Sequence, residues 1–290
     1  MFALFQFAFI QNAFLAGSIV AIATAVLGYF LVVRGLTFAG HALSSIGFAG
    51  AAGAVLVGAP PVYGMLVFTV GASLVISLLG REVRERDIAI GVIMTFALGL
   101  GILFLSLYHG YAEQAYSILF GSIVGISRSD VLRSLLLSLG VLAALAVMAR
   151  PLLFASFDPD VAEARGMPVR ALGSIFLVVV ALTISIAVQV VGVLLVFALL
   201  VGPAATASRL TYRLGMAIAI AVLLGLAYTW LGILLASISP WPVSFFITVL
   251  SFGVYLPVRL LVRPRANQAL RPKGPAGIAP ALSAEEHRHA

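Results

Sequence analysis

Apolar stretches long enough to cross a lipid bilayer recur along nearly the whole chain. A membrane-spanning helix needs about 20 mainly apolar residues, and hydrophobic residues make up 62% of this sequence while charged residues make up 9%. The mean hydropathy of +1.18 is far above that of a soluble domain. No long stretch shows the alternation of an outer-membrane barrel strand. We therefore expect an all-α protein, a polytopic bundle of transmembrane helices.

The apolar stretches divide into about nine predicted spans. They cover residues 7–33, 36–57, 62–79, 88–108, 131–148, 171–207 as two spans, 214–235 and 243–261. Residues 109–127 carry Glu113, Gln114 and several glycines, and we expect a loop with a half-helix there; a further span in this segment is the alternative. Residues 171–207 are apolar throughout and long enough for two spans joined by almost no loop, the arrangement that we favour. One long span followed by a broken helix is the alternative, and it would leave eight spans.

Basic residues fall almost entirely on one side of these predicted spans. With nine spans and the N-terminus outside, fifteen of the seventeen lysine and arginine residues lie in the inner loops and tail, and only Arg128 and Arg133 lie outside. This is the positive-inside pattern. We therefore expect residues 1–263 to form the transmembrane domain, with a disordered cytoplasmic tail over residues 264–290. Topology and anionic membrane lipids account for the net charge of +7 without a nucleic-acid partner.

The sequence lacks the groups that several kinds of chemistry need. It has no cysteine, which excludes disulfides and thiolate metal sites. Its only lysine is Lys273, so there is no GxxxxGK[ST] phosphate loop. No charged residue lies well inside a predicted span, which argues against a proton-driven carrier. We expect no enzyme activity, and ATP used for transport would be hydrolysed by another chain.

A short polar segment, residues 158–168, separates two of the apolar stretches. Asp158 is a good N-cap, Pro159 suits the first helical position, and Asp160 places negative charge at the positive end of a helix. Gly166 can adopt the left-handed conformation that ends a helix. A helix of about two turns is unstable alone in water, so we expect a partner to pack on it. A capped connector without a partner is the alternative.

The stretch that follows, residues 187–207, reads AVQVVGVLLVFALLVGPAATA. Together with the capped segment before it, this pattern closely resembles the permease subunits of bacterial ATP-binding-cassette importers for zinc, manganese and iron. The likeness runs from about Asn12 to about Val262. It implies that residues 158–166 form a cytoplasmic coupling helix on which an ATPase subunit acts. The coupling residues that it implies are Asp158, Asp160, Glu163 and Gly166.

One ionisable residue, His41, lies inside a predicted span. Ser45 follows four residues later, on the same side of a helix, and the small residues from Gly47 to Gly53 let another backbone approach. Imidazole suits metals such as zinc and iron, and ionisable groups inside membranes are functional by default. We therefore expect His41 to contact the transported metal, with Ser44 and Ser45 beside the same path. A buried neutral histidine bonded to a backbone carbonyl is the alternative.

The resemblance is informative about this helix as well. In well-studied members of the family the helix resembles Gly-Asp-Ala-Leu/Ile-Ser-His, and its aspartate and histidine face the metal path. When Gly40 and Ser44 are aligned with that motif, His41 stands in the place of the aspartate and Ser45 in the place of the histidine. The carboxylate is lost, so the family's metal selectivity does not carry over to this chain.

The sequence thus predicts the permease subunit of a divalent-metal importer in the bacterial inner membrane. The resemblance implies a permease homodimer, ATP-hydrolysing partner subunits and an extracytoplasmic metal-binding protein, with zinc, manganese or iron as cargo and no permanently bound cofactor. Gly192 and Pro203 are the predicted gating or kink positions, since proline removes a helical hydrogen bond. The alternatives are a secondary carrier or channel that works without ATP, and a membrane scaffold without transport.

Overall fold

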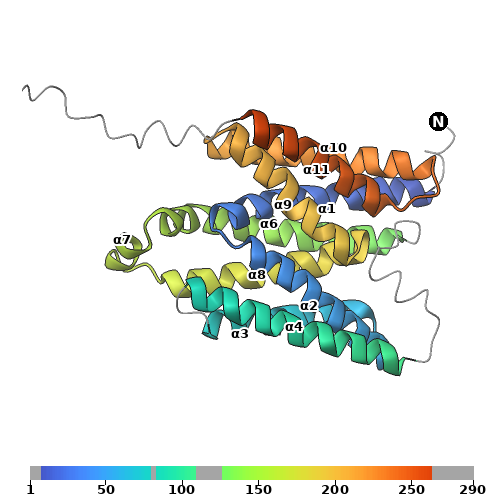
Figure 1. The fold of residues 1–290 in the computed structure, drawn as a ribbon, viewed down its shortest axis with the longest axis horizontal. Coiled ribbons are helices and arrows are strands. Elements are labelled where there is room, and N and C mark those ends of the chain that lie inside the picture. The colour runs from blue at the N-terminus through green and yellow to red at the C-terminus, as the bar shows by residue number, and fades with distance from the viewer. Residues whose placement is uncertain (1–7, 80–82, 109–125, 263–290) are drawn as a thin grey trace, which may run out of the picture.

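The computed structural model describes residues 8–79, 83–108 and 126–262, and its regular secondary structure in these ranges is entirely helical (Figure 1). The helices are α1 (Ala8–Val33), α2 (Thr37–Leu56), α3 (Pro61–Leu79), α4 (Val83–Leu107), α6 (Arg128–Phe157), α7 (Pro159–Ala164), α8 (Val169–Val191), α9 (Val193–Leu210), α10 (Leu214–Ser237) and α11 (Val243–Leu261). In this part of the chain, eight helices are long and apolar enough to cross a membrane, and α9 contains a shorter apolar segment. The predicted all-α bundle is confirmed. The predicted tail and most of the polar segment 109–127 lie outside the described residues.

Two helices extend beyond their predicted bounds. The helix α4 begins inside the charged run that precedes the fourth span, and α6 continues to Phe157 although its span was predicted to end at residue 148. The predicted break at Arg150 and Pro151 is wrong. Leu152 and Ala155, beyond the proline, are both buried, and this packing outweighs the single helical hydrogen bond that proline removes.

The spanning helices form two groups with α8 between them, and α6 packs on α8 and on α1 of the second group. In the first group α2 packs on α3 and α4, and in the second α1 packs on α9 and α10 while α11 packs on α9. The helix α8 contacts α3 and α2 on one side and α1 and α6 on the other. Figure 1 shows α2, α3 and α4 along one side of the molecule, with α10 and α11 along the opposite side.

Glycines bring the backbones of the first group into direct contact. A Cβ atom added to Gly50 on α2 would lie 2.2 Å from the carbonyl oxygen of Gly64 on α3, and one added to Gly64 would lie 2.0 Å from the carbonyl oxygen of Gly50. No side chain fits at either position without separating the helices. The predicted close approach along this small-residue run is confirmed, as expected where packing rather than water drives helix association.

A single residue joins α8 to α9. Gly192 has φ 84° and ψ 159°, a conformation that residues with a Cβ rarely adopt. Its N–H donates to the carbonyl of Val188 at 2.8 Å, and its own carbonyl accepts from the N–H of Val196 at 3.2 Å. The chain therefore turns back on itself with almost no loop, as we favoured, and α9 runs obliquely towards the end where α8 began (Figure 1). Of these two helices only α8 is among the eight candidate spans of the described residues, so the structure supports the lower of the two span counts.

Candidate functional site

The short helix α7 forms where the sequence predicts it. The Oδ1 atom of Asp158 accepts a hydrogen bond from the backbone N–H of Val161 at 3.0 Å, which satisfies a free donor of the first turn. Pro159 occupies the first helical position. At the other end Gly166 has φ 78°, and its N–H donates to the carbonyl of Glu163 at 2.9 Å. Both predicted helix ends are confirmed.

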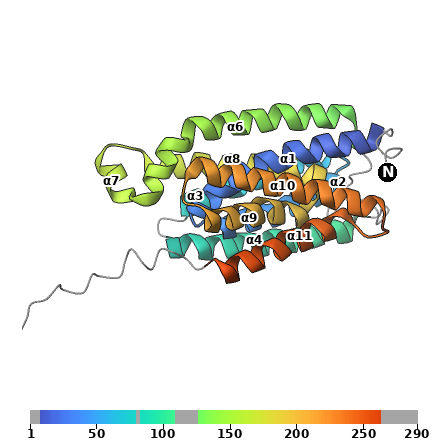
Figure 2. The ribbon, with the colours of Figure 1, turned by 90° about the horizontal axis from the view of Figure 1, so that it is seen from above.

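This helix projects beyond the rest of the bundle, at the end where α6 stops and α8 begins (Figure 2). Ala162 is its one buried residue, while Asp160 and Glu163 are exposed. The Arg165 guanidinium lies 5.5 Å from the ring centroid of Phe154 on α6, a cation–π contact that holds α7 against the bundle. The outer side of α7 therefore presents carboxylates that a partner could contact.

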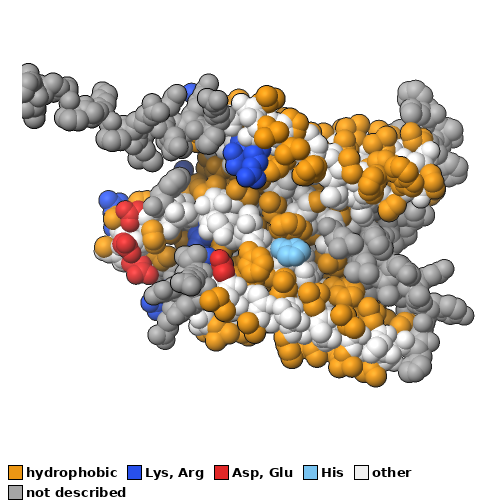
Figure 3. Space-filling model, in the orientation of Figure 1, with side chains coloured by type: hydrophobic (Ala, Val, Ile, Leu, Met, Phe, Trp, Pro, Cys, Tyr) orange, Lys and Arg blue, Asp and Glu red, His pale blue; other side chains and the backbone are white. Residues whose placement is uncertain are grey.

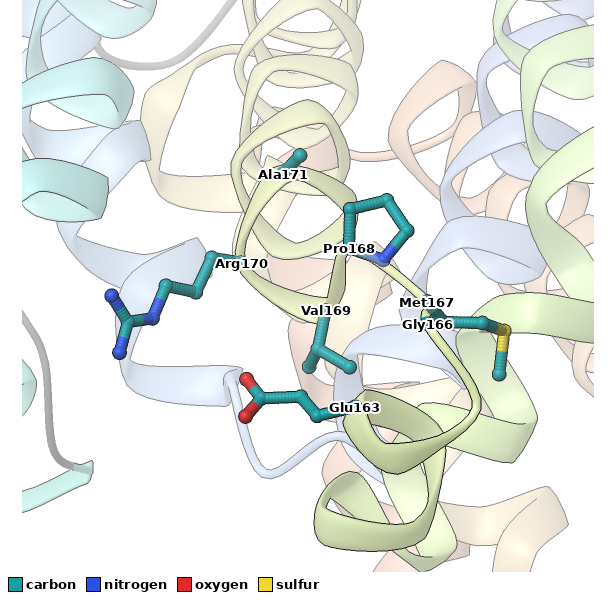
Figure 4. Close-up of a pocket in the computed structure, with 7 residues that line it drawn as sticks. All are labelled: Glu163, Gly166, Met167, Pro168, Val169, Arg170 and Ala171. Atoms are coloured by element: carbon teal, nitrogen blue, oxygen red, sulfur yellow. The ribbon is translucent and has the colours of Figure 1, made fainter.

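A shallow hollow of about 530 Å³ lies between α7 and the start of α8 (Figure 4). Glu163 and Gly166 line it from α7 and its end, and Met167 and Arg170 line it from the segment that continues into α8. Among the described residues the ion pair present is that of Arg133 with Asp130, and Glu163 and Arg170 form none. Both charges at this hollow are therefore available to a partner.

His41 lies on the exposed side of α2. Its ring meets that of Phe197 on α9 edge to face, with centroids 4.9 Å apart and planes at 63°. The one histidine of the described residues is visible on the face shown in Figure 3, among mainly apolar side chains. The alternative of a buried histidine is therefore wrong.

The two neighbouring serines face different ways. The Ser45 hydroxyl is partly exposed and donates to the carbonyl of His41 at 3.2 Å, so it shares the side of α2 that carries the imidazole. Ser44 is 2% exposed, and its hydroxyl donates to the carbonyl of Gly40 at 3.1 Å. The structure brings His41 and Ser45 together and turns Ser44 towards the core. In the described ranges no group of three or more His, Asp or Glu side chains is placed to hold a metal ion.

The two predicted gating residues lie at the junction of α8 with α9 and inside α9, the helix that carries Phe197. Gly192 ends α8, and Pro203 is buried inside α9, which continues as a helix through it. Phe197 lies between them in sequence, and it is the residue of this stretch that the sequence reading missed. Its contact with His41 joins two distant helices, so no local spacing could have revealed it. A role in gating stays a prediction.

The fold defines a multi-pass membrane protein with an exposed connecting helix at one end. The sequence model of the ABC 3 transport family matches residues 6–261, and the chain belongs to this family. It is 33% identical over 231 residues to the manganese transport system membrane protein MntC of Halalkalibacterium halodurans, covering 79% of each chain. It is 32% identical to the probable iron transport system membrane protein of Haemophilus influenzae, covering 80% of this chain and 85% of that protein.

A solved structure has the same fold. The structure titled PsaBC from Streptococcus pneumoniae in complex with Fab matches with a TM-score of 0.81 and 27% identity, and the match covers 94% of this chain and 100% of the compared chain. The bundle described above therefore has the fold of that solved structure over nearly the whole of both chains.

Proposed function

We propose that this chain is the permease subunit of a bacterial inner-membrane importer for a divalent transition-metal ion, driven by a separate ATPase subunit. The observation that carries the proposal is α7, a helix capped at both ends that stands clear of the bundle between two long helices. Membership of the ABC 3 transport family supports it. The α7 end would face the cytoplasm, because Arg128 and Arg133 lie at the other end of α6, as the positive-inside pattern requires.

The proposed cargo is manganese or iron, with zinc as the remaining candidate. The relatives named for manganese and for iron support the first two. The exposed imidazole of His41 suits iron or zinc better than manganese, which prefers carboxylate, carbonyl and water oxygens. We therefore propose that His41 and the Ser45 hydroxyl guide the ion, with water completing its coordination. A second copy of the chain facing the first would double both groups, and an extracytoplasmic binding protein would deliver the ion.

Coupling would pass from α7 to this face through the chain itself. ATP-driven closure of the partner subunits would press on α7, whose exposed Asp160 and Glu163 offer contacts. The helix α8 starts five residues after α7 ends and runs to Gly192, where α9 begins. The Phe197 ring on α9 touches the His41 ring. A movement of α7 would thereby change the surroundings of the imidazole.

Metal content of whole cells tests the proposal. A strain that lacks this chain is complemented with wild type, His41→Ala or Ser106→Ala and grown in limiting manganese, iron or zinc. Ser106→Ala is the control for loss of a polar side chain at an exposed position away from His41, since the Ser106 hydroxyl is exposed on α4 and donates to the carbonyl of Leu103 in its own helix. We expect one metal to fall in the deletion strain, and wild type and Ser106→Ala to restore it while His41→Ala does not.

Two outcomes would contradict this proposal in different ways. No change of any metal in the deletion strain would show that metal import is not its function. Full restoration by His41→Ala would show that the ion takes a path without this imidazole. Uptake that persists when the ATPase is absent would favour the ATP-independent carrier or channel.

A further inference from the structure

Arg34 lies in the short turn that joins α1 to α2, and its side chain reaches the two helices on either side of α7 in the chain. Its Nη1 atom donates to the carbonyl oxygen of Leu152 on α6 at 3.5 Å. Its guanidinium lies 5.4 Å from the ring centroid of Phe176 on α8, within the range of a cation–π contact. A Cβ atom added to Gly173, also on α8, would lie 3.8 Å from its Nη2 atom. One side chain therefore connects the α1–α2 turn to both α6 and α8.

Both contacts lie close to α7 along their helices. Leu152 is five residues before the end of α6 at Phe157, and Phe176 is seven residues after the start of α8 at Val169. At 1.5 Å per residue these separations are roughly 8 and 11 Å. The helix α7 projects from the end that α6 and α8 share (Figure 2). A displacement of α7 that shifts the end of α6 or the start of α8 therefore acts directly on the surroundings of the Arg34 guanidinium.

The turn that carries Arg34 is well suited to pass such a movement on to α2. Gly35 has φ 66°, and the N–H groups of Gly35 and Leu36 donate to carbonyls in the last turn of α1 at 3.1 and 2.9 Å. These are the two hydrogen bonds of a Schellman motif, which fix the chain as it leaves a helix. Leu36 is buried, and its carbonyl accepts from the N–H of Gly40 on α2 at 3.1 Å. His41 follows directly, so about two helical turns of chain separate it from Arg34.

We propose that Arg34 is a positioning residue that couples the α7 connection to the helix carrying His41. This role rests on the proposed function, in which a partner ATPase presses on α7. It provides a shorter route than the one along the whole of α8 to Gly192 and α9. The planar guanidinium can stack on the Phe176 ring while it donates to α6, whereas a lysine ammonium is a compact point charge. Arg34→Lys therefore keeps the positive charge and loses the simultaneous contact with both helices.

Hydrogen exchange of the full-length chain in nanodiscs tests this coupling without a transport assay. The readout is the exchange rate of the backbone amides of residues 34–40, which reports local opening of the turn and the start of α2. Gly166→Pro redirects the chain beyond α7, and it should make these amides exchange about threefold faster because the hold on Arg34 loosens. Arg34→Lys should have the same effect. In the double variant the two effects should not multiply, since each breaks the same connection.

The double variant separates coupling from a merely structural role of the arginine. If Arg34 only stabilised its own turn, the two substitutions would act independently and the double variant would exchange about ninefold faster. That result would overturn the coupling, as would an unchanged rate in Gly166→Pro alone. Phe176→Leu, which removes the ring and keeps an apolar side chain, should match Arg34→Lys and likewise add nothing to Gly166→Pro.

The matched control is Arg150→Gln, since Arg150 is an exposed arginine two residues before Leu152 on α6. In this background Gly166→Pro should keep its full threefold effect. Loss of the effect here would show that positive charge at this end of the bundle matters rather than the contacts of Arg34, and the proposal would then be wrong.

Metal uptake by cells tests whether the connection serves transport. The deletion strain complemented with Arg34→Lys should accumulate the metal about tenfold more slowly than with wild type, at an equal amount of inserted protein. Arg150→Gln should accumulate it at the wild-type rate. A wild-type rate in Arg34→Lys would overturn the role of Arg34 in transport. Absence of uptake with wild type would contradict the proposed function alone, because the exchange experiment needs no transported metal.

Discussion

The helices α7 and α2, on which the proposed function depends, are built in opposite ways. The six residues of α7 include one buried side chain, and local hydrogen bonds at Asp158 and Gly166 define its ends. The twenty residues of α2 include thirteen that are buried, and contacts with α3 and α4 define its course. A helix held by its own caps can change without unfolding the bundle. A helix held by packing tolerates change only on its exposed side, where His41 lies.

The largest effect should come from filling the α2–α3 crossing. The side chain of Gly50→Val would meet the Gly64 backbone, which cannot move aside as a flexible side chain can. We expect a loss of about 3 kcal/mol or more in the free energy of unfolding, seen as a lower Tm and less folded protein in detergent. Gly71→Ala on α3 is the control, because its added Cβ would meet nothing within 4 Å. Equal Tm values for the two variants would show that the α2–α3 contact can accommodate a side chain at Gly50.

The comparison of α7 with α2 also predicts a variant that loses transport but stays folded. Gly166→Pro places a residue with φ near −65° where the chain has φ 78°, and so it should redirect the chain between α7 and α8. We expect metal uptake to be abolished while the amount of inserted protein and its Tm stay close to those of wild type. Deletion of residues 159–165 should behave in the same way. Normal uptake by either variant would show that α7 does not couple ATP hydrolysis to transport.

The α8–α9 junction depends on both local conformation and packing. One residue in an unusual conformation, Gly192, joins two helices that are largely buried. Gly192→Ala keeps the packing almost unchanged but strains the backbone at φ 84°, which should cost about 1–3 kcal/mol. The Tm should fall less than in Gly50→Val. The control is Gly253→Ala on α11, because Gly253 has no positive φ and its added Cβ would meet nothing within 4 Å. This variant should leave the Tm unchanged. A Tm for Gly192→Ala equal to that of this control would show that the junction can adopt another conformation.

The difference between structure set by local residues and structure set by packing explains what could be predicted from the sequence. The caps of α7 and the spans are local properties, visible as Asp158, Gly166 and apolar runs of the right length. The continuation of α6 past Pro151 was missed because it depends on packing by residues beyond the proline. The contact of His41 with Phe197 joins residues far apart in the chain. Such pairs leave no pattern in a single sequence, and so the site could be predicted only as its separate residues.

The smallest effect should come from removing one cap of α7. Asp158→Ala removes the acceptor for the Val161 N–H and should destabilise α7 by about 1 kcal/mol. Hydrogen exchange of a peptide covering residues 158–166 should then be about fivefold faster, since α7 opens locally without the bundle. Asp160→Asn is the control, because Asp160 accepts no comparable hydrogen bond in the described structure. Faster exchange only in Asp158→Ala, with an unchanged Tm, would show that α7 is independent of the bundle, as its caps imply. Equal exchange in the two variants would mean that Ala162 and the Arg165–Phe154 contact hold α7 in place, and that α7 resembles α2 more closely than its caps suggest.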